Sequence, residues 1–171
     1  MSSLSYLQPL EVFSETRRAK KITRNRRCYI KLPRTSVGIL QAINANKTRE
    51  TGTATLIGNN LLLTAAHCVF DEQLVGFCKH LRFYPNYPNI LKNFNGIACV
   101  VPKQFIESSG QDLRHDYAIV LLEKDNVSKK YGSMDISINS IDTTKPITAI
   151  GYPNDPPFLR GSVYKHRGCL L

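Results

Sequence analysis

Leu61-Leu62-Leu63-Thr64-Ala65-Ala66-His67-Cys68, residues 61–68, joins an apolar run to a small-residue turn that presents one histidine. The apolar run follows the turn residues Gly58-Asn59-Asn60, and this pattern predicts a buried β-strand. The two alanines leave room for a partner beside the imidazole of His67. The stretch therefore indicates a β-rich fold that holds a histidine at the end of a rigid strand.

A second buried-strand pattern begins beside an acidic residue. Asp116 directly precedes the continuous apolar run of residues 117–122, which we expect to be buried on both faces. A carboxylate held there can fix the tautomer of an imidazole, which can then take a proton from a hydroxyl nucleophile. His115 is next to Asp116, and we do not expect it to be the base, because neighbouring strand residues point to opposite faces.

Short strand patterns separated by turns extend over much of the remaining chain. Residues 52–57 and 61–65 predict a hairpin around Gly58-Asn59-Asn60. Helical periodicity is nearly absent, which together with the frequent turns predicts an all-β barrel. Further strands are expected at residues 37–43, 81–84, 97–101 and 146–150.

The composition is that of a globular chain with an uneven excess of positive charge. A chain of 171 residues, 42% of them hydrophobic, is long enough for one domain with a proper core. The net charge is +10, and residues 17–34 hold many basic residues and no acid. We interpret residues 1–35 as a basic extension or a propeptide, with a transit segment as an alternative. Nucleic-acid binding is only weakly supported, because a charge run with few aromatic residues is poor evidence for it.

The cysteines and the apolar runs limit the remaining classes. An odd number of cysteines, five, means that at least one thiol is free or paired between chains. Cys68, Cys78 and His80 do not have the spacing of a zinc site. No apolar run approaches the length that a membrane span needs. The N-terminus has no clear signal peptide, so the compartment is unknown at this stage.

These motifs resemble those of the chymotrypsin-like (trypsin-fold) serine peptidases over roughly residues 36–160. The resemblance rests on Thr55-Leu56-Ile57, on Leu62-Leu63-Thr64-Ala65-Ala66-His67-Cys68 and on Asp116-Tyr117-Ala118-Ile119-Val120-Leu121. Gly151-Tyr152-Pro153 after a strand is closer to the glutamyl endopeptidase branch, and this likeness alone implies a glutamyl preference.

The resemblance implies a double β-barrel with the active site in the cleft between the barrels. It makes His67 the general base and Asp116 its orienting acid, with a polypeptide substrate, no cofactor and no metal. The family is mostly secreted. In the secreted branch, the cysteine after the histidine forms a disulfide with an earlier cysteine. When the chains are aligned on Thr55-Leu56-Ile57, the position of that earlier cysteine is Gly52 here, so we expect no disulfide at Cys68.

The nucleophile is the main departure from the family pattern. The family has its serine in Gly-x-Ser-Gly, and no such motif follows Asp116. Ser162 in Arg160-Gly161-Ser162-Val163 and Cys169 in Arg167-Gly168-Cys169-Leu170 lack the required glycines, so we expect neither to be the nucleophile. The resemblance thus predicts a complete first barrel over residues 36–124, a connector over 125–145 and a second barrel only begun over 146–171.

Two hypotheses for the function follow. The first is a serine-type endopeptidase, with the base and its orienting acid present and the nucleophile missing from this chain, which by itself is expected to be a poor catalyst. The alternative is a catalytically inactive binding protein with a protease fold. The oligomeric state is left open.

Overall fold

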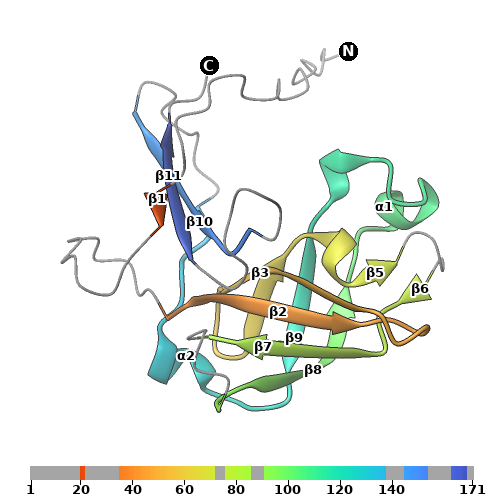
Figure 1. The fold of residues 1–171 in the computed structure, drawn as a ribbon, viewed down its shortest axis with the longest axis horizontal. Helices are drawn as coiled ribbons and strands as arrows, with labels where there is room; N and C mark the ends of the chain where they lie inside the picture. The colour runs from red at the N-terminus through yellow and green to blue at the C-terminus, as the bar shows by residue number, and fades with distance from the viewer. Residues whose placement is uncertain are drawn as a thin grey trace, which may run out of the picture.

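The computed structural model describes residues 20–21, 35–71, 76–85, 91–137, 145–153 and 163–168 of the chain. Its centre is a closed barrel of antiparallel strands in the order β2-β3-β4-β9-β8-β7 (Figure 1). The prediction of an all-β fold with one complete barrel is confirmed. The barrel strands are β2 (Val37–Ile43), β3 (Arg49–Leu56), β4 (Leu61–Thr64), β7 (His80–Tyr84), β8 (Phe94–Val100) and β9 (Ala118–Leu122).

Short elements connect the barrel strands. The single-turn 3-10 helix η1 (Ala66–Cys68) follows β4, and the helix α1 (Lys103–Glu107) and the 3-10 turn η2 (Leu113–His115) lie between β8 and β9. A two-stranded ribbon of β5 (Phe70–Asp71) and β6 (Gly76–Phe77) follows η1. Helix α2 (Val127–Tyr131) follows β9. None of the described helices is long and apolar enough to cross a membrane.

The predicted hairpin is present, and its strands differ from the prediction mainly in length. β3 and β4 pair through Thr55 with Leu63 and Leu56 with Leu62. β3 starts at Arg49 rather than at residue 52, because its polar first residues still pair with the end of β2. The expectation that residues 117–122 are buried on both faces is wrong: Ala118, Val120 and Leu122 are buried, whereas Ile119 and Leu121 are half-buried. One face of β9 lines the barrel, and its other face is only partly covered.

Buried side chains from five of the six strands fill the barrel interior, and β8 adds the partly buried Phe94 and Cys99. Leu40, Leu56, Leu62, Phe83 and Val120 are all fully or almost fully buried in one continuous core. Gly38 permits β2 to approach β7 closely, because a Cβ there would collide with the carbonyl oxygen of Tyr84 and with the ring of Phe83. This packing holds the strand ends in fixed positions.

A second, three-stranded sheet lies beside the barrel in the order β1-β11-β10 (Figure 1). It consists of β1 (Lys20–Lys21), β11 (Tyr164–Gly168) and β10 (Ile147–Gly151). Two residues of the basic segment 17–34 therefore pair with the C-terminal part of the chain. The backbone N–H of Tyr152 donates to Thr53 Oγ1 at 2.8 Å, and Tyr152 packs with Val37 and Ile39. These contacts join the second sheet to the barrel.

Candidate active site

His67 lies in η1, three residues after the end of β4. The strand ends at Thr64, whose hydroxyl donates to the carbonyl oxygen of Thr53 at 2.9 Å, and η1 begins at Ala66. Ala66 is completely buried, so only a small side chain fits at this turn. The core thus holds the backbone on the N-terminal side of His67 while the imidazole reaches the surface.

Asp116 lies two residues before the start of β9, the neighbour of β4 in the barrel. The antiparallel register pairs Thr64 with Ala118, so the chain leaving β4 runs beside the chain that enters β9. Asp116 is also the C-terminal cap of η2. Two segments far apart in the sequence are therefore brought together by the pairing of β4 with β9.

The structure brings His67 and Asp116, both singled out from the sequence, into direct contact. His67 Nδ1 lies 2.7 Å from Asp116 Oδ2, and the backbone N–H of His67 donates to Asp116 Oδ1 at 3.0 Å. The histidine side chain is 57% exposed and that of the aspartate only 16%. With Nδ1 directed at the carboxylate, Nε2 is the ring nitrogen that remains for exchange of a proton with another group.

Two side chains act on the pKa of His67. The hydrogen bond with the Cys68 side chain has the largest effect, and burial acts against it. The contact with Asp116 adds to the Cys68 effect, so that together they raise the pKa of His67 from 6.5 to about 9. The carboxylate of Asp116 stabilises the imidazolium form, and the hydrogen bond with Cys68 acts in the same direction.

We expect the stability contributed by His67 to depend on pH. Its pKa is higher in the folded than in the unfolded state, so its contribution is complete below about pH 6.5 and disappears as the pH rises through about 9. Denaturant unfolding of the wild type and of His67→Gln, at about pH 6 and about pH 10, measures the difference between the two proteins. We expect the difference in unfolding free energy between the two proteins to be largest at the lower pH. A difference that grows with pH would contradict the raised pKa of His67 in the folded state.

Cys68 is a free thiol, as are Cys78 and Cys99 among the described cysteines. A Cβ built on Gly52 would lie 3.5 Å from the Cβ of Cys68 and too close to its sulfur. Gly52, which the alignment placed at the position of the disulfide partner, therefore lies beside Cys68. Cys78 donates from Sγ to Asn44 Oδ1 at 2.8 Å, and burial is the main cause that raises its pKa to about 11. It is therefore a protonated, structural thiol at neutral pH.

Gly52→Cys is expected to form a disulfide with Cys68. The Cβ separation of 3.5 Å lies at the short end of the range that disulfides adopt. Closing this loop should stabilise the oxidised protein by roughly 2–4 kcal/mol. Unfolding with and without a reductant measures the effect, with Gly52→Ser as the control that crowds the same sulfur but cannot bond to it. Equal stability of the oxidised and reduced Gly52→Cys protein would show that the two residues do not face each other as described.

Among the described residues, His115 was also singled out from the sequence, and it does not join this pair. Ser162 and Cys169 lie outside the described residues. His115 belongs to the turn η2 and not to a strand. The argument that it points away from Asp116 because neighbouring strand residues face opposite sides was therefore wrong. Its ring nitrogen Nδ1 instead contacts Asp112 Oδ2 at 2.9 Å. Asp112 was not recognised from the sequence, although an aspartate is a common cap at the start of a helical turn.

Comparisons with known proteins give similarity in structure only. Neither a protein-family model nor a curated protein matches the sequence. The protease Anisep from Arthrobacter nicotinovorans is similar with a TM-score of 0.68 and 17% identity, covering 79% of this chain and 64% of that protein. The thermostable serine protease AL20 from an extremophilic microorganism has a TM-score of 0.68 and 22% identity, covering 80% of this chain and 66% of that protein.

A Glu endopeptidase is similar to the same degree, with a TM-score of 0.68 and 22% identity, covering 88% of this chain and 67% of that protein. The chain thus spans about two thirds of the length of these three solved structures, between 64% and 67%. At such low identity the likeness concerns the architecture, and it agrees with the barrel described above. On this evidence, the chain has the trypsin-like fold of serine proteases.

Proposed function

We propose that His67 and Asp116 form the general-base half of a serine-type endopeptidase site. The observation that supports this most is the contact of 2.7 Å between His67 Nδ1 and Asp116 Oδ2, made at the ends of two paired barrel strands. In our proposal residues 36–124 form the unit that carries both groups, residues 125–145 connect it to residues 146–171, and residues 1–35 are an extension or propeptide.

Each of the two residues has a defined part in the proposed reaction. Asp116, largely buried, keeps the Nδ1 proton of His67 in place and stabilises the imidazolium. Nε2 of the exposed His67 ring takes the proton of the nucleophile as that group attacks the peptide carbonyl, and later returns the proton to the leaving amine. Because its pKa is raised, the ring must be neutralised first, so we propose that the reaction is faster on the alkaline side of neutrality.

The nucleophile is the part of the proposal without an assigned residue. The sequence contains no Gly-x-Ser-Gly. The trypsin-like fold shared with serine proteases supports a polypeptide as the substrate class. A preference for glutamate rests only on Gly151-Tyr152-Pro153 and on the similarity to the Glu endopeptidase.

The proposal is tested by measuring peptide hydrolysis. The 171-residue chain and the product of the complete coding sequence of its gene would each be assayed on labelled casein and on peptides that contain glutamate. We expect one of the two proteins to hydrolyse them and His67→Ala to lower the rate by at least about 10³-fold. Glu107→Gln, which removes an exposed acid in α1, is the matched control and should leave the rate unchanged. Hydrolysis that survives His67→Ala would overturn the proposal, as would its absence from both proteins.

The lack of Gly-x-Ser-Gly favours one second candidate, a catalytically inactive binding protein with this fold. Its net charge of +10 points to an acidic protein as the partner. Titration of the purified chain with an acidic polypeptide at low and high salt tests this candidate. Binding that weakens with salt, together with no hydrolysis, would support it, and binding that salt does not affect or no binding at all would exclude it.

A further inference from the structure

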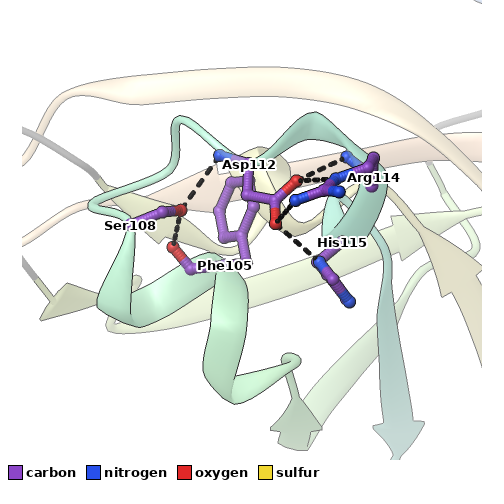
Figure 2. A network of polar contacts seen from close by, with 5 residues as sticks. All are labelled: Phe105, Ser108, Asp112, Arg114 and His115. Carbon is purple, nitrogen blue, oxygen red and sulfur yellow. Dashed lines mark hydrogen bonds and ion pairs between the residues drawn. The ribbon is translucent and has the colours of Figure 1, made fainter. Parts of the chain in front are cut away.

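The carboxylate of Asp112 is the centre of a network of polar contacts at the turn that leads into Asp116 (Figure 2). Its Oδ1 accepts from the backbone N–H and from Nε of Arg114, at 3.3 Å and 2.8 Å. Its Oδ2 accepts from Arg114 Nη2 and contacts His115 Nδ1, both at 2.9 Å. One side chain thus contacts two of the three residues of η2.

Asp112 and Asp116 are the two ends of the same turn. Asp112 is the N-terminal cap of η2 and Asp116 is its C-terminal cap. Inside the turn, the backbone N–H of His115 donates to the carbonyl oxygen of Asp112 at 2.9 Å, and that of Asp116 donates to Leu113 at 3.3 Å. Because η2 consists of only one helical turn, the conformation of the residue at its start limits where the residue at its end can lie.

A second chain of contacts anchors Asp112 to the barrel core. Its backbone N–H donates to Ser108 Oγ at 3.0 Å, and the Ser108 hydroxyl donates to the carbonyl oxygen of Phe105 at 2.9 Å. Phe105 is fully buried in the core, with its ring against Phe70 (edge-to-face, centroids 6.3 Å apart). Figure 2 shows these contacts, from the Phe105 carbonyl through the Ser108 hydroxyl to the backbone nitrogen of Asp112. The start of η2 is therefore tied to the packed interior, whereas the Leu113 and Arg114 side chains are exposed.

We propose that Asp112 is a positioning residue that holds the turn η2 so that Asp116 meets His67 with both of its oxygens. The inference rests on the proposed function, in which the contact between His67 and Asp116 orients the base. Asp116 needs a defined orientation because Oδ1 accepts from the His67 backbone while Oδ2 faces the ring. A shift of about 1 Å in a supporting group is enough to disrupt the two hydrogen bonds between Asp116 and His67.

The charge of Asp112 suits this role. Its hydrogen bonds with Arg114, and then with His115, hold the pKa of the Asp112 carboxyl well below its usual range. The group therefore stays ionised throughout the range in which His67 titrates, and the turn keeps its cap while the imidazole gains or loses a proton.

The test uses NMR titration of His67 in the 171-residue chain, so it does not depend on hydrolysis. The variants are Asp112→Ala, Asp112→Asn and Asp116→Asn, with Glu107→Gln as a control that removes an exposed acid from the neighbouring helix α1. In Asp112→Ala we expect the pKa of His67 to fall, but by less than it falls in Asp116→Asn. We also expect Asp112→Ala to lose the NMR signal of the His67 Nδ1–H that is bonded to Asp116. Asp112→Asn keeps an oxygen for the Arg114 N–H and should give an intermediate pKa, while Glu107→Gln should behave as the wild type.

The outcomes separate this inference from the proposed function. If Asp116→Asn lowers the pKa of His67 and Asp112→Ala leaves both the pKa and the Nδ1–H signal unchanged, Asp112 does not position Asp116 and the proposed pair still stands. If Asp116→Asn also changes nothing, the proposed pair itself is wrong and the role of Asp112 falls with it. Should Asp112→Ala not fold, Asp112→Asn decides alone, and a wild-type pKa and Nδ1–H signal in that variant would overturn the inference.

Discussion

Asp116→Asn is expected to lower peptide hydrolysis by about 10⁴-fold in whichever product of the gene proves active. Oδ1 of Asp116 accepts from the backbone N–H of His67, so the asparagine oxygen is held at that position and its amide N–H₂ faces Nδ1 of the ring. An N–H₂ group donates where the carboxylate accepted. The imidazole would then carry its proton on Nε2, where it cannot take a proton from a nucleophile.

The expected tautomer can be measured even where no hydrolysis is found. Nitrogen NMR of the 171-residue chain reports which ring nitrogen of His67 is protonated, and we expect Nδ1 in the wild type above its pKa and Nε2 in Asp116→Asn. Glu107→Gln, which also exchanges an acid for its amide, should keep the wild-type tautomer. A His67 ring with its proton on Nδ1 in Asp116→Asn would contradict the assigned roles.

Phe83→Ala is expected to reduce the free energy of unfolding by about 3–5 kcal/mol. Phe83 lies in β7 and its side chain is 0% exposed. It is paired with Leu40 of β2 on one side and with Phe94 of β8 on the other, so its loss would leave a cavity at the point where the barrel closes. Chemical denaturation with a linear extrapolation to water measures the effect.

Phe77→Ala is the matched control for this measurement. Phe77 is the same residue type but is 48% exposed, at an edge-to-face distance of 5.5 Å from Phe70. We expect it to cost only about 1 kcal/mol, because half of its surface already contacts water. Equal costs for the two substitutions would mean that Phe83 does not lie in the core as described.

Much of the fold and the central pair of the site could be predicted from the sequence. The strands at residues 37–43 and 81–84, the hairpin around Gly58-Asn59-Asn60 and the all-β class follow from local patterns, and the structure confirms them. Local patterns are informative here because the side-chain period of a strand and the turn preferences of glycine and asparagine depend only on near neighbours. His67 and Asp116 were found because each adjoins such a strand.

Other features could not be predicted because they depend on residues far apart in the chain. The half-buried state of Ile119 and Leu121 depends on what covers the outer face of β9. The role of Asp112 depends on Ser108 and on the backbone of Phe105, which leaves no signal beyond a common capping residue. The pairing of Lys20–Lys21 with β11 joins opposite parts of the sequence, and their basic character indicated only an extension.

The sequence by itself determined which segments become strands, that the fold is all-β and that a histidine and an aspartate stand at strand ends. Only the tertiary structure decided that β4 pairs with β9 in the register of Thr64 with Ala118, that this register brings His67 Nδ1 to 2.7 Å from Asp116, and that the turn before Asp116 is anchored to the core. The physical reason is that strand formation is governed by local periodicity and backbone preference, whereas partner choice and register are selected by packing of the whole barrel interior.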